Sequence, residues 1–179
     1  MTPFLAERRF SRAGYWTPPC PTVNVAAMDL QNYTRESAVI PQLKCATLVE
    51  AVTTLVDRLA EAGVVKSASE LVAEVMRREE EGSTVVGGGL VVPHARCRGL
   101  DEVHIALTTL DPPLELEAED GEPVDIVMLL VGPERDPRQM LRVLARLARL
   151  VKDRAFLDRI REAGTASDLL AVFGEASDS

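Results

Sequence analysis

The stretch that decides the fold runs from residue 78 to residue 94 and reads Arg78-Glu-Glu-Glu-Gly-Ser-Thr-Val-Val-Gly-Gly-Gly-Leu-Val-Val-Pro-His94. Within it, two short apolar runs at 84–86 and 90–92 flank the glycine triplet 87–89. This pattern predicts two extended segments joined by a tight turn. Three successive glycines also let the backbone approach a ligand closely and direct N–H groups into a shared space, as anion-binding nests do.

The side chains of this stretch are those that phosphate chemistry needs. His94 is neutral enough near pH 7 to act as a nucleophile, and it can carry a phosphoryl group on either ring nitrogen. Pro93 fixes the backbone before it, which ends the strand and holds the imidazole in a defined direction. The hydroxyls of Ser83 and Thr84 and the guanidinium of Arg78 are suitable partners for phosphate oxygens. Two alternatives remain open on the residues alone: a phosphate loop facing a histidine, or a turn beside an ordinary core or surface histidine.

Upstream of this stretch, two helices are predicted. Thr47 begins a T-x-x-E capping box followed by apolar residues at helical spacing until Gly63. Ser67 begins a second one, and its helix ends in a charged run before Gly82.

Downstream, strands and helices alternate. Residues 103–110 alternate as a strand does, and the apolar run 126–131 is typical of a strand buried on both faces. A strand-ending turn is expected at 111–113, which reads Asp-Pro-Pro, and a solvated loop or hairpin at the acidic stretch 115–122.

Three helices complete the predicted fold. Asp136-Pro137 has the signature of an N-cap followed by an N1 proline, and a long amphipathic helix follows it. A shorter helix stops at Gly164, and a last one is capped by Thr165 and runs through Phe173. Because strands and helices alternate without strict βαβ regularity, we predict an α/β domain with a mixed β-sheet flanked by helices.

The bulk composition limits the domain count. The length of 179 residues suits one domain plus a tail. Residues 1–27 hold the only tryptophan, Trp16, and a proline-rich stretch, but show no helical or strand period. We expect 1–27 to be a disordered tail or the product of a misassigned start, 28–174 to be the folded domain, and 175–179 to be a C-terminal tail.

The charge and the cysteines exclude several classes of function. The net charge of −8 argues against general nucleic-acid binding, and no apolar run is long enough for direct membrane insertion. The three cysteines do not resemble a disulfide framework, which favours a cytoplasmic protein.

The pattern R-E-x-x-G-S-T-x-x-G-x-G-x-x-x-P-H, which ends at His94, resembles the active-site signature of a bacterial enzyme family. These are the fructose/mannitol-type (type 2) enzyme IIA domains of the phosphotransferase system, including the nitrogen-regulatory branch. The resemblance covers about 28–173, and the stretch 121–126 also resembles the start of a family strand. It implies a single IIA domain of the mixed-sheet type.

The resemblance also implies a function and a site. His94 would accept a phosphoryl group from phospho-HPr, or from a nitrogen-type HPr homologue, and pass it to a IIB partner or use it as a regulatory signal. Arg78 would stabilise the charge of the transferring group. The other expected phosphate-binding residues are Ser83, Thr84, Gly87, Gly88 and Gly89. The family implies no metal and no cofactor.

One position departs from the family pattern. Members commonly carry a second histidine at the start of the helix that follows the buried strand, and Met140 stands at that place in this chain. A thioether cannot donate a hydrogen bond to a phosphoryl oxygen. This departure keeps an alternative open, in which the chain is a degenerate IIA-like binding or regulatory domain that has lost transfer.

Three further features are interpreted as structural. Cys97 follows His94 at H-x-x-C spacing, but a zinc site needs four ligands, so an ordinary, partly buried thiol is expected. His104 lies on a predicted strand and is expected to be satisfied or solvent-facing. Four arginines share one face of the helix after Pro137, which predicts a solvated face or, alternatively, a docking surface for an acidic partner; they are Arg138, Arg142, Arg146 and Arg149.

Overall fold

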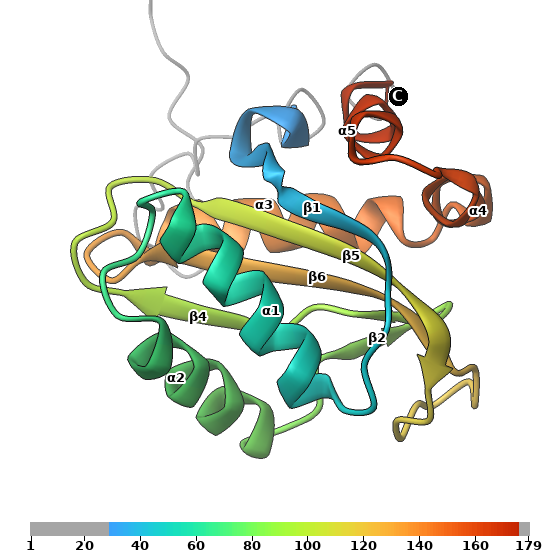
Figure 1. The fold of residues 1–179 in the computed structure, drawn as a ribbon, viewed down its shortest axis with the longest axis horizontal. Helices are drawn as coiled ribbons and strands as arrows, with labels where there is room; N and C mark the ends of the chain where they lie inside the picture. The colour runs from blue at the N-terminus through green and yellow to red at the C-terminus, as the bar shows by residue number, and fades with distance from the viewer. Residues whose placement is uncertain (1–28, 176–179) are drawn as a thin grey trace, which may run out of the picture.

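A six-stranded mixed sheet organises residues 29–175, the part of the chain that the computed structural model describes (Figure 1). The strand order is β1-β5-β6-β3-β2, with β4 paired to β6. β5 pairs with β6 and β2 with β3 in antiparallel fashion, whereas β1 runs parallel to β5, and β3 and β4 run parallel to β6. The strands are β1 (Thr34–Leu43), β2 (Val85–Gly87), β3 (Leu90–Val91), β4 (His94–Cys97), β5 (His104–Leu114) and β6 (Val124–Pro133).

Helices cover both faces of this sheet. The helical elements are η2 (Leu30–Tyr33), a single 3-10 turn, and α1 (Leu48–Glu61), α2 (Ala68–Glu80), α3 (Pro137–Leu150), α4 (Arg154–Glu162) and α5 (Ala166–Glu175). Figure 1 shows α1 and α2 in front of the sheet and α3 behind it, and α5 packs against β1. The prediction of a mixed sheet flanked by helices is confirmed. The expectations for residues 1–27 lie outside the described residues, and α5 extends to Glu175.

β6 separates two hydrophobic cores. Its side chains alternate between the two faces, as they must in any strand. Ile126, Met128 and Leu130 pack into the core beneath α3, α4 and α5. Val127, Leu129 and Val131 pack into the core beneath α1 and α2. The prediction that 126–131 is a strand buried on both faces is therefore confirmed.

Most predicted caps form, and one does not. The Thr47 hydroxyl accepts a hydrogen bond from the Glu50 amide at 3.2 Å, and the Asp136 carboxylate accepts one from the Arg138 amide at 3.2 Å. At α5, the Asp168 amide donates to the Thr165 hydroxyl at 3.1 Å. Ser67 precedes α2 as expected but makes no side-chain cap, so the predicted capping box there is wrong.

Two strands differ from the sequence-based expectation. β5 continues through the Asp-Pro-Pro stretch to Leu114, where a strand-ending turn was predicted. An irregularity between Thr109 and Leu114 lets β5 rejoin β6 at Val124, so pairing resumes beyond the prolines. β1 was not predicted at all. It lies at the edge of the sheet order and contains Pro41, a residue that sheets tolerate at an edge.

Pro93 divides what would otherwise be one strand. β3 pairs with Ile126 and Val127, whereas β4 pairs with β6 from Leu130 onward. Because β5 occupies the other side of β6, both β3 and β4 lie on the same side of it. β4 is consequently an edge strand within the described residues, and the region around His94 is open on that side.

Candidate functional site

Strand geometry places His94 on the α3 face of the sheet. His94 lies beside Leu130 in the parallel ladder, and Leu130 belongs to the core beneath α3. Its neighbour Ala95 lies beside Val131 and is buried in the opposite core. Alternation then returns Arg96 to the same face as His94. The edge strand thus presents an imidazole and a guanidinium side by side.

The backbone fixes the orientation and tautomer of the imidazole. His94 Nδ1 lies 2.9 Å from the carbonyl oxygen of Val92. A carbonyl oxygen can only accept a hydrogen bond, so Nδ1 carries the proton in the neutral ring. The lone pair is therefore on Nε2, the nitrogen that is left available for a nucleophilic role.

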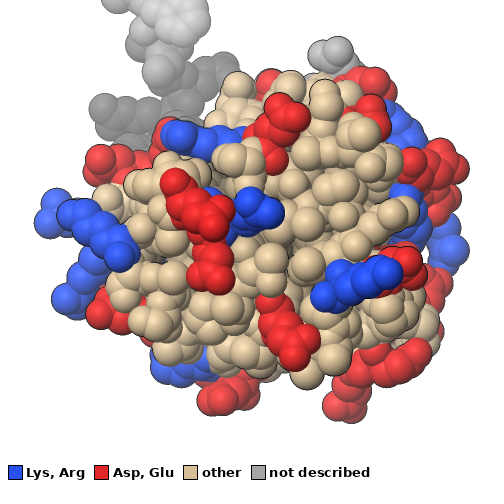
Figure 2. All heavy atoms as spheres, in the orientation of Figure 1, with Lys and Arg blue, Asp and Glu red and all other residues tan. Residues whose placement is uncertain are grey.

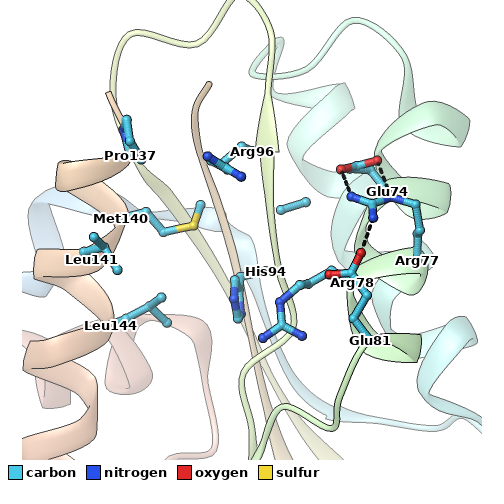
Figure 3. A pocket seen from close by; sticks show the side chains of 11 residues that line it. Glu74, Arg77, Arg78, Glu81, His94, Arg96, Pro137, Met140, Leu141 and Leu144 are labelled. Atoms are coloured by element: carbon cyan, nitrogen blue, oxygen red, sulfur yellow. Dashed lines mark hydrogen bonds and ion pairs between the residues drawn. The ribbon is translucent and has the colours of Figure 1, made fainter. Parts of the chain in front are cut away.

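His94 lines a cleft of about 320 Å³ between α2 and α3, called here the His94 cleft. Figure 3 shows the imidazole between Arg78, which approaches from α2, and Met140 and Leu144, which approach from α3. The full lining is Glu74, Arg77, Arg78, Glu81, His94, Ala95, Arg96, Pro137, Met140, Leu141 and Leu144. The predicted pair His94 and Arg78 is thus brought together by the fold.

Both acidic residues of the His94 cleft form ion pairs with the same arginine. Arg77 forms an ion pair with Glu74 at 2.6 Å and a second one with Glu81. The hydrogen bond from Arg77 lowers the pKa of Glu74, and the positive charges of Arg77 and Arg96 lower it further. Both carboxylates are thus held against Arg77, on the α2 side of the cleft.

Arg78 and Arg96 are not paired with carboxylates. The Arg78 guanidinium donates a hydrogen bond to the Gly82 carbonyl at 3.1 Å, which leaves most of its N–H groups available. Within the described residues, neither side chain takes part in an ion pair. Two guanidiniums without ion-pair partners beside an imidazole form a site suited to an anion.

The opposite wall of the His94 cleft is apolar. Met140 is buried, with 5% of its surface exposed, and a side chain at Gly132 would meet the Met140 methyl group at 2.7 Å. The thioether therefore packs against the sheet close to His94. Beside it, Leu141 is 62% exposed, which is unusual for a leucine in a described helix of this chain.

The glycine triplet lies apart from the His94 cleft. The Gly88 amide donates to an Asp120 carboxylate oxygen at 2.7 Å, and this contact lowers the pKa of Asp120. The Gly88 carbonyl accepts a hydrogen bond from Arg161 at 2.5 Å, and Arg161 also binds Asp125 at 2.6 Å. The glycines have positive φ and form the predicted tight turn, but this turn is held by the acidic loop and α4. None of its residues lines the His94 cleft.

The two predicted hydroxyl residues also lie outside the lining of the His94 cleft. Thr84 is buried, with its amide 2.9 Å from Glu79 and its hydroxyl bonded to the same carboxylate. Ser83 is exposed, and its oxygen accepts a hydrogen bond from the Val85 amide at 3.3 Å. Both residues thus shape the turn that follows α2.

Cys97 and His104 take up the structural positions expected of them. Cys97 is half-buried at the end of β4, and burial raises the pKa of its thiol, with smaller effects from Glu70 and Glu134. His104 is buried at the start of β5, where burial lowers its pKa, and the charge of Glu102 opposes this shift. Neither residue lines the His94 cleft.

The arginine face of α3 is smaller than predicted. Arg146 is 4% exposed, so it belongs to neither a solvated face nor a docking surface. It lies next to Leu147 on the inward side of the helix, because a turn of 3.6 residues carries it away from the outer arginines. Charge elsewhere is mixed: Figure 2 shows acidic and basic side chains interspersed over the face that carries α1 and α2.

The described residues contain neither a metal-binding cluster nor a membrane-spanning helix. No group of three or more His, Cys, Asp or Glu side chains in residues 29–175 is arranged to hold a metal ion. No helix in that range combines the length and the apolar composition that crossing a membrane requires.

Sequence reasoning missed Arg96 as a member of the site. The signal was available in the strand period, because a residue two positions after His94 in an extended segment must share its face. It was obscured by Pro93, which was interpreted as ending a strand, whereas β4 begins at the next residue.

Residues 32–176 match the family model described as phosphoenolpyruvate-dependent sugar phosphotransferase system, EIIA 2. A nitrogen regulatory protein of Bradyrhizobium diazoefficiens is 32% identical over 146 residues, which are 81% of this chain and 94% of that protein. An Escherichia coli phosphotransferase system component, the 2-O-alpha-mannosyl-D-glycerate-specific EIIABC, is 33% identical over 150 residues, 83% of this chain and 23% of that component.

Solved structures share the fold. The nitrogen regulatory protein IIA-Ntr of Neisseria meningitidis superposes with a TM-score of 0.73 at 22% identity, over 80% of this chain and 98% of that one. The mannitol IIA of Escherichia coli superposes with a TM-score of 0.65 at 18% identity, over 78% and 97% of the two chains. At these identities the likeness concerns the fold alone.

Proposed function

The chain belongs to the EIIA 2 family of the phosphoenolpyruvate-dependent sugar phosphotransferase system, and from this premise we propose that it carries a phosphoryl group on His94. One observation supports this role above the others. The Val92 carbonyl oxygen lies 2.9 Å from Nδ1 and accepts its proton, which leaves the Nε2 lone pair available. His94 lines a cleft together with Arg78, whose guanidinium has no carboxylate partner within the described residues.

The transfer step needs only positioning and charge stabilisation. The Nε2 lone pair forms a bond to the phosphorus of the donor phosphohistidine while the donor P–N bond breaks and its electron pair returns to the donor ring. His94 then holds a phosphoryl group on Nε2 and a proton on Nδ1, so its ring is positively charged. The Val92 carbonyl stabilises that charge, and Arg78 stabilises the phosphoryl oxygens.

The partners belong to the same proposal. The donor is phospho-HPr or a nitrogen-type HPr homologue, and the acceptor is the cysteine of a IIB protein or a regulatory target that reads the phosphorylation state. The relative whose length this chain spans to 94% is named a nitrogen regulatory protein, which favours the regulatory output. The cycle is assigned to the cytoplasm.

A second candidate function rests on Met140. The methionine is buried beside His94, in the wall of the same cleft, and its thioether cannot donate a hydrogen bond to a phosphoryl oxygen. In this alternative, the chain is a degenerate binding domain that keeps the fold but does not transfer phosphate.

The phosphate contacts of Ser83, Thr84 and the glycine turn at 87–89 stay a prediction. In the unphosphorylated structure, Asp120 occupies the Gly88 amide at 2.7 Å and Glu79 occupies the Thr84 amide at 2.9 Å. A phosphoryl contact at either amide requires one of these carboxylates to be displaced.

The experiment is enzymatic labelling. The protein is incubated with phosphoenolpyruvate, enzyme I and HPr, and the acid-labile phosphoryl adduct is quantified. We expect labelling of the natural chain and of His104→Gln, a control at the second histidine, and none of His94→Ala. A natural chain that stays unlabelled under conditions that label an authentic IIA protein would establish the degenerate alternative. Transfer from the labelled protein to a purified IIB protein then separates the transport output from the regulatory one.

A further inference from the structure

Besides Arg78, the His94 cleft contains one other guanidinium without an ion-pair partner among the described residues, that of Arg96. Arg96 lies two residues after His94 on β4, so both side chains project from the same face of the edge strand. Both line the His94 cleft, together with Arg78 from α2 (Figure 3). The His94 cleft is therefore lined by one arginine from the strand that carries His94 and by another from a neighbouring helix.

Arg96 differs from the arginines that stabilise the fold in its exposure and in its lack of a partner among the described residues. Its side chain is exposed, and no ion pair or side-chain hydrogen bond joins it to another described residue. The adjacent Arg98, by contrast, binds Glu134 at 3.0 Å and does not line the His94 cleft. An exposed arginine that lines a cleft and makes no hydrogen bond or ion pair there has N–H donors available to a ligand.

The charge balance of the His94 cleft specifies that ligand. Glu74 and Glu81 share one ion-pair partner, Arg77, which holds Glu74 at 2.6 Å. Three arginines against two glutamates give the lining a net positive charge, and Arg78 and Arg96 are its two guanidiniums without an ion-pair partner among the described residues. A phosphoryl group on a histidine carries two negative charges, and its three oxygens exceed what a single guanidinium can bind.

We propose that Arg96 is a phosphoryl-binding residue, and that Arg78 and Arg96 hold the phosphoryl group of His94 between them. This inference rests on the proposed function, because it names a further ligand contact of the same reaction. Arg96 supplies hydrogen-bond donors in a cleft whose α3 wall offers only the Met140 thioether close to His94. No proton moves to or from Arg96; it orients the oxygens and offsets their charge.

Two phosphoryl donors distinguish this role from docking. Phosphoramidate is a small molecule that transfers its phosphoryl group to histidine without a protein surface, whereas phospho-HPr must dock. Arg96→Ala, Arg96→Lys and the control Arg98→Ala are each labelled with both donors, at saturating phospho-HPr in single turnover. The hydrolysis rate of phospho-His94 is measured in each isolated protein.

We expect Arg96→Ala to slow labelling about tenfold with both donors and to alter the hydrolysis rate of phospho-His94, as the loss of one charge-assisted contact would. Arg96→Lys should recover part of the loss, because it retains the charge but not the planar fork. Arg98→Ala should match the natural chain.

Two results would overturn the inference. Slower labelling by phospho-HPr with unchanged phosphoramidate labelling would show that Arg96 contacts the donor protein instead. Unchanged labelling with both donors would show that Arg96 has no role. Failure of the proposed function is distinct from either, since the natural chain would then be labelled by phosphoramidate but not by phospho-HPr.

Discussion

The His94 cleft and the glycine turn at 87–89 contain similar chemical groups in opposite states. At the glycine turn, Arg161 binds Asp125 at 2.6 Å and Asp158 at 3.2 Å, and the Gly88 amide is bound by Asp120. In the His94 cleft, Arg78 and Arg96 lack carboxylate partners among the described residues. Arginines and backbone donors occur in both regions, but only the His94 cleft leaves them available.

The difference teaches how to separate structure from function in this chain. The bidentate pair between Arg161 and Asp125 joins α4 to the start of β6, and the hydrogen bond from Arg161 to Gly88 attaches the glycine turn to both. Internal pairing of this kind contributes to the stability of the fold. Positive charge without internal pairing contributes to ligand binding. Replacing an arginine by alanine should therefore reduce phosphoryl transfer in the His94 cleft and reduce the stability of the fold at the glycine turn.

The largest expected effect is the loss of transfer in Arg78→Ala. We expect the rate of His94 phosphorylation to fall about 100-fold, because one preorganised charged donor is removed from the transferring group. The free energy of unfolding should change by less than about 0.5 kcal/mol, since the Arg78 side chain bonds only the Gly82 carbonyl. Rapid-quench labelling and urea titration measure the two quantities. Arg58→Ala, which removes an exposed ion pair with Glu61, is the matched control.

Arg161→Ala should show the reverse pattern. Its removal leaves Asp125, whose side chain is 25% exposed, without its partner, and we expect a loss of about 2 kcal/mol in the free energy of unfolding. Labelling of His94 in the folded protein should stay within about twofold of the natural rate. Arg154→Ala breaks an exposed pair with Glu122 and should cost less than about 0.5 kcal/mol. A large loss of labelling in Arg161→Ala would remove the distinction between the two regions.

Met140→His sharpens the comparison inside the His94 cleft. An imidazole on the α3 wall would add a hydrogen-bond donor for the phosphoryl group, so we expect labelling to accelerate about fivefold, the value of one hydrogen bond. Met140→Leu, which retains an apolar side chain of similar volume, should leave the rate unchanged. Equal rates for the two variants would mean that the wall residue does not contact the phosphoryl group.

The smallest expected effect concerns pH and the second histidine. Burial lowers the pKa of His104 in the folded chain below its ordinary value of 6.5, so the unfolded chain binds the proton at higher pH than the folded chain does. Stability should therefore rise with pH between the folded pKa and 6.5, and it should be lost as the pH falls through that window. Urea titrations at several pH values in this range give the free energy of unfolding. Its dependence on pH should be shallower in His104→Gln than in the natural chain. A steeper slope would contradict the assignment.

The sequence was sufficient where local rules are strong. Capping residues and helical periods located the helices, and the apolar run at 126–131 located the central strand. The pairing of His94 with Arg78 was predicted through the resemblance. Long-range pairing was not visible: β1 contains Pro41, and β5 crosses two prolines, so both strands form only because β6 and β5 supply partners across the sheet. The same reason hid the partners of the glycines, since Asp120 and Arg161 are distant in sequence.

The hydrogen bond between His94 Nδ1 and the Val92 carbonyl limits how partner proteins can exchange a phosphoryl group with His94 under the proposed function. It leaves Nε2 as the one ring nitrogen that can hold the phosphoryl group. The group must therefore leave from the same atom that accepted it. The donor and acceptor proteins would then compete for the same surface around the His94 cleft and could not be bound there together. A partner protein that binds around His94 without donating or accepting a phosphoryl group would then act as an inhibitor.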